Sequence, residues 1–323
     1  MSKPKALLAY PVAKEIQEYL HEHFDLKTLD FTNPQKYEDI LEKITDVEGA
    51  VVLGTPIDKT LLEYGKKLKV ISNITVGYNN FDIDAMIEKG VVGTHSPGVL
   101  DNTVADYVIG LMIATGRKIT QLNQFVKNGQ WERMDNSYLF GKDMTGSTLG
   151  IIGMGRIGEM VAKRCSLGFD MKVIYNNRSR KPNIEESMNV QYVEFDQLLK
   201  TSDYVVILTP LTESTQHILS YREFSLMKKD SILINVSRGP VVDERALIDA
   251  LERGLILGAG LDVYEQEPIH KDNPLLKMDN VITTPHIAAG TEKTMNDLAW
   301  NAAKSLVSFL VDNKAINVIP EMK

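Results

Sequence analysis

The sequence predicts an α/β protein made of two parallel-sheet units with a cleft between them. Short apolar runs rich in β-branched residues alternate with amphipathic helical segments over residues 5–95, and the alternation resumes after residue 147. Strands separated by helices pair in parallel. A G-x-G-x-x-G turn opens the second series, and a length of 323 residues suggests roughly two domains.

The first unit is predicted from five strand-like runs with helices between most of them. Strands are expected at Lys5–Tyr10, Asp25–Leu29, Ala50–Leu53, Val70–Thr75 and Val91–Thr94, with helices such as Ala13–Phe24, Asp58–Leu68 and Asp82–Lys89. After the fourth strand, Gly77 would let backbone N–H groups come close to a small anion. A plain turn without a ligand remains the alternative there.

Between the two units, the run from His95 to Gly98 breaks the pattern and predicts a hinge. One long helix is expected from Asp101 to Lys127. Its apolar stripe would consist of Val104, Val108, Leu111, Met112 and Ile119. Because this length exceeds that of a usual core helix, the helix is also a candidate for a subunit interface.

The second unit is predicted around further strands and a closing helix. Strands are expected at Thr148–Ile152, Lys172–Tyr175, Tyr204–Leu208, Ser231–Asn235, Gly258–Val263 and Val281–Thr284, and helices at Glu244–Arg253 and Ala289–Val311. The first strand leads directly into Gly153, Gly155 and Gly158 and then into a helix, whose expected buried face is Ile157, Met160, Val161 and Cys165. Strand, glycine turn and helix in this order are typical of a dinucleotide site, in which the start of the helix holds the phosphates.

The residues after the second strand of this unit indicate which dinucleotide is preferred. A carboxylate about 20 residues after the glycines would bind the ribose hydroxyls of NAD(H). Here Asn176, Asn177, Arg178 and Ser179 occupy that region. Arg178 could meet a 2′-phosphate with charge-assisted hydrogen bonds, which favours NADP(H) and leaves NAD(H) as the alternative. A solvated basic loop is the other interpretation.

Three residues of complementary chemistry follow three strands of the second unit. Arg238, Glu267 and His286 each lie just beyond an expected strand end, the edge at which open parallel sheets bind ligands. A histidine can donate and accept a proton near neutral pH, a carboxylate can orient it, and an arginine can polarise a keto oxygen. Each residue alone could also be an ordinary surface or loop residue.

Composition and charge argue against several other classes of protein. The net charge of −7 argues against a nucleic-acid binder, and no apolar run approaches a membrane span. Cys165 is the only cysteine, so no intrachain disulfide can form, and a cytoplasmic location is expected. No metal site is predicted.

Several ordered motifs together resemble one family, the D-isomer-specific 2-hydroxyacid dehydrogenases. They are V-G-Y-N-N-F-D from Val76, T-V-A-D from Thr103, G-M-G-R-I-G from Gly153, P-L-T from Pro210, N-V-S-R-G-P-V-V-D-E from Asn235, A-G-L-D-V-Y-E-Q-E-P from Ala259 and T-P-H-I-A from Thr284. The resemblance implies that Arg238 binds substrate, that His286 exchanges the proton and that Glu267, rather than Glu265, is its partner. It also implies that backbone N–H groups near Val76 and Gly77 hold the substrate carboxylate.

The same resemblance implies further contacts and an architecture. Cofactor contacts are expected at Thr103, Arg156, Ile157, Thr209, Pro210, Thr215, Val236, Ser237, Asp262 and Ala288. A doubly wound, flavodoxin-like substrate domain would comprise residues 1–100 and 288–323, and a doubly wound Rossmann domain residues 101–287. Homodimers built around the long helix are usual in such proteins.

Departures from the family pattern narrow the range of expected cofactors and substrates. The missing ribose-binding acid fits NADP-preferring reductases of glyoxylate, hydroxypyruvate or 2-ketogluconate, Thr209 replaces a frequent histidine, and Glu267 replaces the glutamine of formate-oxidising relatives. The first hypothesis is reduction of a small 2-keto acid such as glyoxylate or hydroxypyruvate, with 2-ketogluconate next. The alternative is a nucleotide-sensing binding protein resembling the C-terminal binding protein corepressors.

Overall fold

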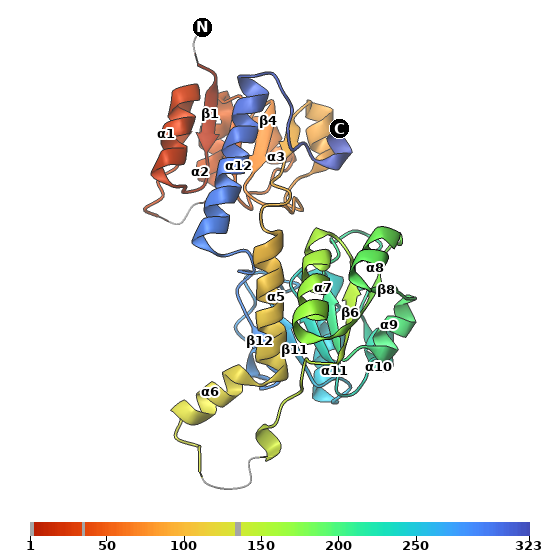
Figure 1. The fold of residues 1–323 in the computed structure, drawn as a ribbon. Helices are drawn as coiled ribbons and strands as arrows, with labels where there is room; N and C mark the ends of the chain where they lie inside the picture. Colours follow the sequence, from red (N-terminus) through yellow and green to blue (C-terminus); the bar gives the residue numbers. More distant parts are fainter. Residues whose placement is uncertain (1–2, 34–35, 133–136) are drawn as a thin grey trace. The chain divides into compact units, whose positions relative to one another are not determined.

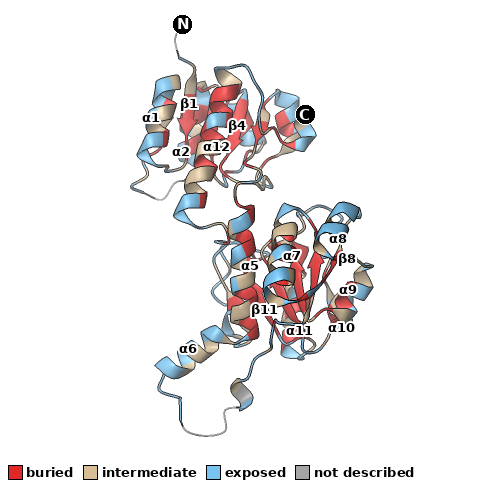
Figure 2. Cartoon of the chain, viewed as in Figure 1, coloured by how far each residue is buried: buried red, intermediate tan, exposed pale blue. Residues whose placement is uncertain are grey.

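The computed structural model describes residues 3–33, 36–132 and 137–323, and the chain forms two compact units. Unit 1 comprises Met1–Leu100 and Gly290–Lys323, and unit 2 comprises Asp101–Ala289 (Figure 1). Each unit contains a parallel sheet, which confirms the predicted fold class. In both units the buried residues concentrate in the strands (Figure 2).

Unit 1 is a five-stranded sheet with the order β2-β1-β3-β4-β5, paired in parallel throughout. Its strands are β1 Lys5–Leu8, β2 Asp25–Thr28, β3 Gly49–Val52, β4 Val70–Asn73 and β5 Val92–Thr94. Its helices are α1 Lys14–His23, α2 Tyr37–Lys43, α3 Lys59–Tyr64, α4 Ile83–Lys89 and α12 Glu292–Leu310, with short turns η1 Ile44–Asp46 and η5 Pro320–Met322. Helix α3 is shorter than expected because it ends at its C-cap Gly65.

Unit 2 is a seven-stranded parallel sheet with the order β12-β11-β10-β9-β6-β7-β8. Its strands are β6 Thr148–Ile152, β7 Lys172–Asn176, β8 Gln191–Tyr192, β9 Tyr204–Ile207, β10 Ile232–Asn235, β11 Gly258–Leu261 and β12 Val281–Thr283. Its helices are α5 Asp101–Gly116, α6 Ile119–Lys127, α7 Arg156–Phe169, α8 Pro182–Met188, α9 Phe195–Thr201, α10 Tyr221–Leu226 and α11 Glu244–Glu252, with η2 Ser137–Leu139, η3 Gly239–Val241 and η4 Pro274–Lys277.

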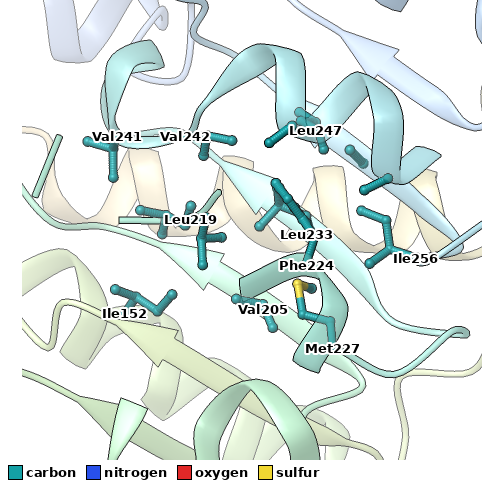
Figure 3. Packing of buried hydrophobic residues seen from close by; sticks show 14 of the residues in the cluster. Ile152, Val205, Leu219, Phe224, Met227, Leu233, Val241, Val242, Leu247 and Ile256 are labelled. Atoms are coloured by element: carbon teal, nitrogen blue, oxygen red, sulfur yellow. The ribbon is translucent and has the colours of Figure 1, made fainter. Parts of the chain in front are cut away.

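The core of unit 2 fixes the strands that lead to the candidate site. Apolar side chains from β9 and β10 interdigitate with those of α10 and α11, among them Val205, Leu233, Phe224 and Leu247 (Figure 3). Because every residue of β9 and β10 is buried, these strands cannot shift without opening the core.

The long helix predicted from Asp101 to Lys127 is wrong, because the chain forms two helices there. Lys118 has a φ of 52°, in the left-handed region, and separates α5 from α6. The predicted stripe holds within α5, where Val108 and Met112 are buried, but Ile119 is 48% exposed. None of the residues of α6 is buried.

The predicted buried face of α7 needs a smaller correction. Val161 and Cys165 are buried as expected, but Ile157 and Met160 are only partly buried. Gly158 and Ala162 complete the buried face instead, since small residues let the helix lie close to the sheet. Burial raises the pKa of the Cys165 thiol to about 12, which makes this cysteine a core residue and not a nucleophile.

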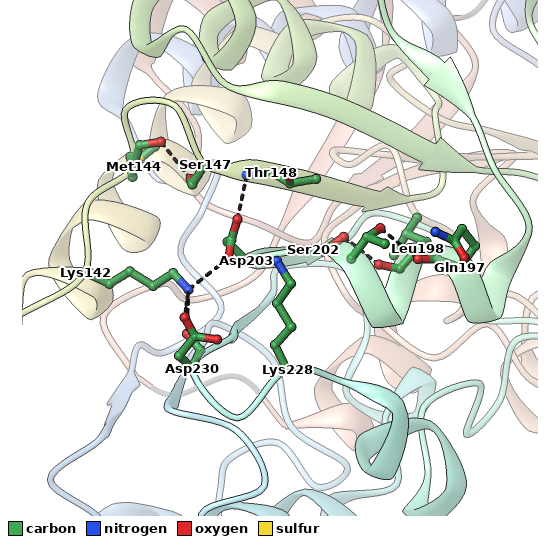
Figure 4. Close-up of polar contacts among 11 residues, drawn as sticks. Lys142, Met144, Ser147, Thr148, Gln197, Leu198, Ser202, Asp203, Lys228 and Asp230 are labelled. Atoms are coloured by element: carbon green, nitrogen blue, oxygen red, sulfur yellow. Dashed lines mark hydrogen bonds and ion pairs between the residues drawn. The ribbon is translucent and has the colours of Figure 1, made fainter.

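At the amino edge of the unit 2 sheet, Asp203 joins the sheet to a preceding segment (Figure 4). Its carboxylate accepts hydrogen bonds from Thr148 N at 2.8 Å and from the Nζ atoms of Lys142 and Lys228, each at 3.1 Å. Burial would raise the carboxyl pKa, but these hydrogen bonds outweigh burial and lower it. Lys142 also pairs with Asp230 at 2.6 Å.

We expect Asp203→Asn to lower the free energy of unfolding at pH 7 by about 1–3 kcal/mol, because two partly buried lysines lose their charged partner. The difference from wild type should shrink as the pH falls through the lowered pKa of Asp203, since a protonated carboxyl has already lost these contacts. Urea unfolding at pH 7 and at low pH measures both effects. The control is Asp249→Asn, which breaks an exposed pair with Arg253 and should have a much smaller effect. Equal effects of the two variants would contradict the interpretation.

Candidate active site

The glycine turn lies where the chain reverses direction across the unit 2 sheet, between the carboxyl ends of β6 and β9. Gly153 has a φ of 100°, and a Cβ atom there would lie 2.8 Å from Thr209 N. A Cβ atom on Gly158 would lie 2.7 Å from the carbonyl oxygen of Gly153. A Cβ atom on Gly155 would meet nothing within 4 Å, so this glycine faces open space at the start of α7.

This geometry fits a dinucleotide phosphate site. The backbone N–H groups in the first turn of a helix have no intrahelical partner and favour an anion. In α7 they follow directly after Gly155, the backbone N-cap. Arg156 is exposed and pairs with Asp101 at 3.0 Å.

The remaining predicted cofactor residues all lie in unit 2. Thr215 Oγ1 donates to the carbonyl oxygen of Pro210 at 2.6 Å, and Ser237 Oγ donates to Asn235 Oδ1 at 2.9 Å. The others are placed on α5 (Thr103), in the first turn of α7 (Ile157) and beyond the carboxyl ends of β9, β10, β11 and β12 (Thr209, Val236, Asp262 and Ala288).

The loop after β7 contains two arginines in different environments. Asn176 Nδ2 donates to the carbonyl oxygen of Val193 at 2.9 Å, and Asn177 Nδ2 to that of Ser179 at 3.1 Å. Arg180 forms a 2.5 Å ion pair with Glu185. Arg178 is exposed and makes no ion pair with any residue in the described part of the chain.

Glu267 and His286 form a hydrogen-bonded pair beyond the ends of β11 and β12. Glu267 Oε2 lies 2.7 Å from His286 Nδ1, and Glu267 Oε1 accepts a hydrogen bond from Tyr264 N at 3.1 Å. Burial would raise the carboxyl pKa of Glu267, but the contacts with His286 and Tyr264 lower it overall. Glu265, the competing carboxylate, pairs instead with His217 at 2.8 Å.

Arg238 follows β10, the strand beside β11, so the three predicted residues come from three adjacent strand ends. Its Nη1 atom donates to the carbonyl oxygen of Ser237 at 2.6 Å. Burial lowers the pKa of its guanidinium, and the negative charge of Glu267 opposes that effect. Arg238 and Glu267 therefore interact electrostatically, and Glu267 also binds His286.

Asp262, expected only as a cofactor contact, holds the backbone around His286. His286 has a φ of 50°, and its N–H donates to the carbonyl oxygen of Asp262 at 2.9 Å. The buried carboxylate of Asp262 accepts hydrogen bonds from Ile287 N, Ala288 N and Thr284 Oγ1 at 2.7–2.9 Å. The sequence shows an aspartate at a strand end, but its partners lie too far along the chain to be predicted.

Val76 and Gly77 lie in unit 1, after β4. Gly77 N donates to Thr75 Oγ1 at 3.1 Å, so the loop already forms a compact turn. Unit 1 also has a cavity of about 470 Å³ at the carboxyl ends of β1 and β3, lined by Tyr10, Lys36 and Thr55 among others. This is the point where the strand order of unit 1 reverses.

None of the helices in the described part of the chain is long and apolar enough to cross a membrane. Within the same residues, no group of three or more His, Cys, Asp or Glu side chains could hold a metal ion.

Comparisons with known proteins match one family and its fold. The family model described as the NAD-binding domain of D-isomer specific 2-hydroxyacid dehydrogenases matches residues 109–288. Glyoxylate/hydroxypyruvate reductase B of Enterobacter sp. (strain 638) is 40% identical over 317 residues, which are 98% of each chain.

Two solved structures share the complete fold. A glyoxylate reductase from Paecilomyes thermophila has a TM-score of 0.89 and 32% identity, covering 100% of both chains. An NADPH-dependent glyoxylate/hydroxypyruvate reductase from Sinorhizobium meliloti, in complex with NADP and malonate, has a TM-score of 0.86 and 30% identity, covering 99% of this chain and 98% of that one.

We expect Gly153→Ala to weaken binding of the reduced nicotinamide dinucleotide by at least about tenfold, because its Cβ atom would displace the backbone at Thr209 that the turn approaches. Titration of NADPH fluorescence gives the dissociation constant. Gly168→Ala is the control, since Gly168 lies in α7, the helix that follows the turn, and its Cβ would meet nothing within 4 Å. Unchanged NADPH binding by the Gly153 variant would show that the cofactor lies elsewhere.

Proposed function

The chain belongs to the D-isomer-specific 2-hydroxyacid dehydrogenase family, and we propose that it reduces glyoxylate or hydroxypyruvate with NADPH. It is therefore an NAD(P)-dependent oxidoreductase. The observation that carries the proposed mechanism is the 2.7 Å contact between Glu267 and His286, at the strand edge that also bears Arg238. The relatives described above are reductases of this type, and none supports a corepressor-like binding protein.

In the proposed mechanism each of the three residues has one role. When bound, the dinucleotide supplies the hydride to the keto carbon. His286 donates a proton to the oxygen that becomes the hydroxyl, using Nε2, because Nδ1 is engaged by Glu267. Glu267 stabilises the imidazolium before transfer, and Arg238 polarises the keto oxygen and binds the neighbouring carboxylate.

The substrate carboxylate is proposed to bind backbone N–H groups near Val76 and Gly77 of unit 1. Support comes from Gly77, which has no side chain to obstruct an anion, and from the loop's position at a strand's carboxyl end. A carboxylate bound to Gly77 N would compete with its present acceptor, Thr75 Oγ1. Unit 1 thus serves as the proposed substrate domain and unit 2 as the dinucleotide domain.

Further proposals concern the oligomeric state, the cellular location and the partners of the enzyme. A homodimer is supported by the exposed apolar residues of and after α6, where Ile119, Val126 and Trp131 are 48%, 53% and 69% exposed. We place the enzyme in the cytoplasm, where a single buried thiol is unremarkable. The net charge of −7 supports a small-molecule substrate and no nucleic-acid partner.

Assays of NADPH and NADH oxidation with a panel of 2-keto acids test the proposed activity, with 2-ketogluconate as the competing substrate. We expect glyoxylate or hydroxypyruvate to give the highest kcat/KM. His286→Ala and Arg238→Ala should each reduce kcat/KM by at least about a hundredfold while circular dichroism remains unchanged, since proton transfer or polarisation of the oxygen is lost. Full activity of either variant would exclude that residue from the mechanism.

Replacing Glu267 with Gln should narrow the active pH range from its alkaline side. An amide cannot stabilise the imidazolium of His286, so the proton donor is lost at a lower pH. The profile of kcat/KM for the 2-keto acid against pH measures this change, and Glu265→Gln is the control because Glu265 pairs with His217. Identical profiles for wild type and Glu267→Gln would argue against the pairing.

Cofactor preference is tested at the loop after β7. We expect Arg178→Ala to reduce the preference for NADPH over NADH by roughly tenfold to a hundredfold, because a hydrogen-bonded ion pair with the 2′-phosphate is lost. Arg180→Ala is the matched control, since Glu185 already neutralises that arginine. The ratio of kcat/KM values for the two cofactors is the measurement. A larger effect at Arg180 would assign the phosphate to the other arginine.

A further inference from the structure

The segment Asn317–Met322, which we call the strap, extends the edge of the unit 1 sheet. Val318 forms an antiparallel bridge with Thr94, and Ile319 N donates to the carbonyl oxygen of Gly93 at 3.0 Å. Val318 and Ile319 are buried. The strap is therefore fixed to β5 by backbone hydrogen bonds and by apolar contact with the core.

Beyond Ile319 the strap remains attached to the sheet. The thioether sulfur of Met322 accepts a hydrogen bond from Gly93 N at 3.1 Å, and its side chain packs against the core of unit 1. Glu321, between these two anchors, is exposed. Its carboxylate is held close to the sheet edge although it lies in solvent.

The strap contacts the proposed carboxylate loop, Thr75–Asn80, directly at Tyr78 and indirectly through His95. Tyr78 Oη donates to the carboxylate of Glu321, with distances of 3.2 and 3.1 Å to the two oxygens. His95 N donates to the carbonyl oxygen of Asn317 at 3.0 Å, and His95 Nδ1 lies 2.9 Å from the carbonyl oxygen of Val76. The rings of Tyr78 and His95 meet edge to face, with centroids 5.3 Å apart.

The loop has separate anchors on its sheet side. Asn73 Nδ2 donates to the carbonyl oxygen of Gly77 at 3.1 Å, and Asn80 Nδ2 donates to that of Thr55 at 2.8 Å. These contacts fix Gly77 and Asn80 on either side of Tyr78, whose carbonyl oxygen accepts a hydrogen bond from Phe81 N at 3.0 Å and whose ring packs against the core. The side-chain hydroxyl of Tyr78 is held by Glu321.

We propose that Glu321 is a positioning residue that holds the carboxylate loop in its binding conformation through Tyr78. The inference rests on the proposed function, in which Val76 and Gly77 receive the substrate carboxylate. A loop that is ordered beforehand binds an anion without the entropic cost of ordering it. Because the proposed chemical groups Arg238, Glu267 and His286 belong to unit 2, the contact should affect binding of the keto acid rather than the chemical step.

The experiment uses Glu321→Ala, Tyr78→Phe and the double variant, with steady-state kinetics for glyoxylate and NADPH. We expect each single variant to raise the KM for glyoxylate about threefold to tenfold, as fits the loss of one solvent-exposed hydrogen bond. The double variant should be no worse than either single variant, since both remove the same contact. We expect kcat, the KM for NADPH and the melting temperature to remain unchanged.

Glu88→Ala is the control, since Glu88 is an exposed glutamate on α4 of the same unit, outside the strap and the loop. An unchanged KM for glyoxylate, additive effects in the double variant, or a parallel fall in kcat and melting temperature would each overturn the inference. The last result would mean that Glu321 only stabilises the fold.

Hydrogen exchange of residues 75–80, measured without substrate, tests the loop independently of activity. Exchange should be faster in Glu321→Ala and Tyr78→Phe than in wild type and the control, and equal rates would overturn the inference. If exchange is faster but wild type reduces no 2-keto acid, the strap does hold the loop and the proposed function is what has failed.

Discussion

The geometry of the candidate site depends on the buried carboxylate of Asp262. The two carboxylate oxygens accept hydrogen bonds from Ile287 N, Ala288 N and Thr284 Oγ1. The backbone carbonyl oxygen of Asp262 accepts one from His286 N. These contacts hold His286 at a φ of 50°, which residues other than glycine seldom adopt. The backbone position in turn brings the imidazole within 2.7 Å of Glu267. The hydrogen bonds to Asp262 thus offset the backbone strain at His286, and this fixes the direction of the His286 side chain.

The negative charge of Glu267 acts on two neighbouring groups, Arg238 and His286. Glu267 interacts electrostatically with the half-buried guanidinium of Arg238 and lies 2.7 Å from Nδ1 of His286. A carboxylate with a lowered pKa stays ionised at neutral pH and can stabilise whichever neighbour is positive. This arrangement suits a reaction in which the proton held by His286 leaves and Arg238 must remain charged.

Sequence reasoning identified those parts of the protein that follow from local patterns. The strands lie close to the expected apolar runs, and Gly153 and Gly158 stand where added side chains would clash. The break at Lys118 was missed because a lysine in the left-handed region leaves no mark in an otherwise helical sequence. The contact between Tyr78 and Glu321 joins residues 243 positions apart, which no spacing rule can connect. The same holds for the partners of Asp262.

The cluster at these strand ends is proposed to perform a D-specific reduction of a 2-keto acid. Chiral analysis of the glycerate formed from hydroxypyruvate and NADPH tests this claim most directly, because the product records the face that receives the hydride. We expect D-glycerate as the sole enantiomer. Formation of L-glycerate, or of both enantiomers, would contradict this proposal.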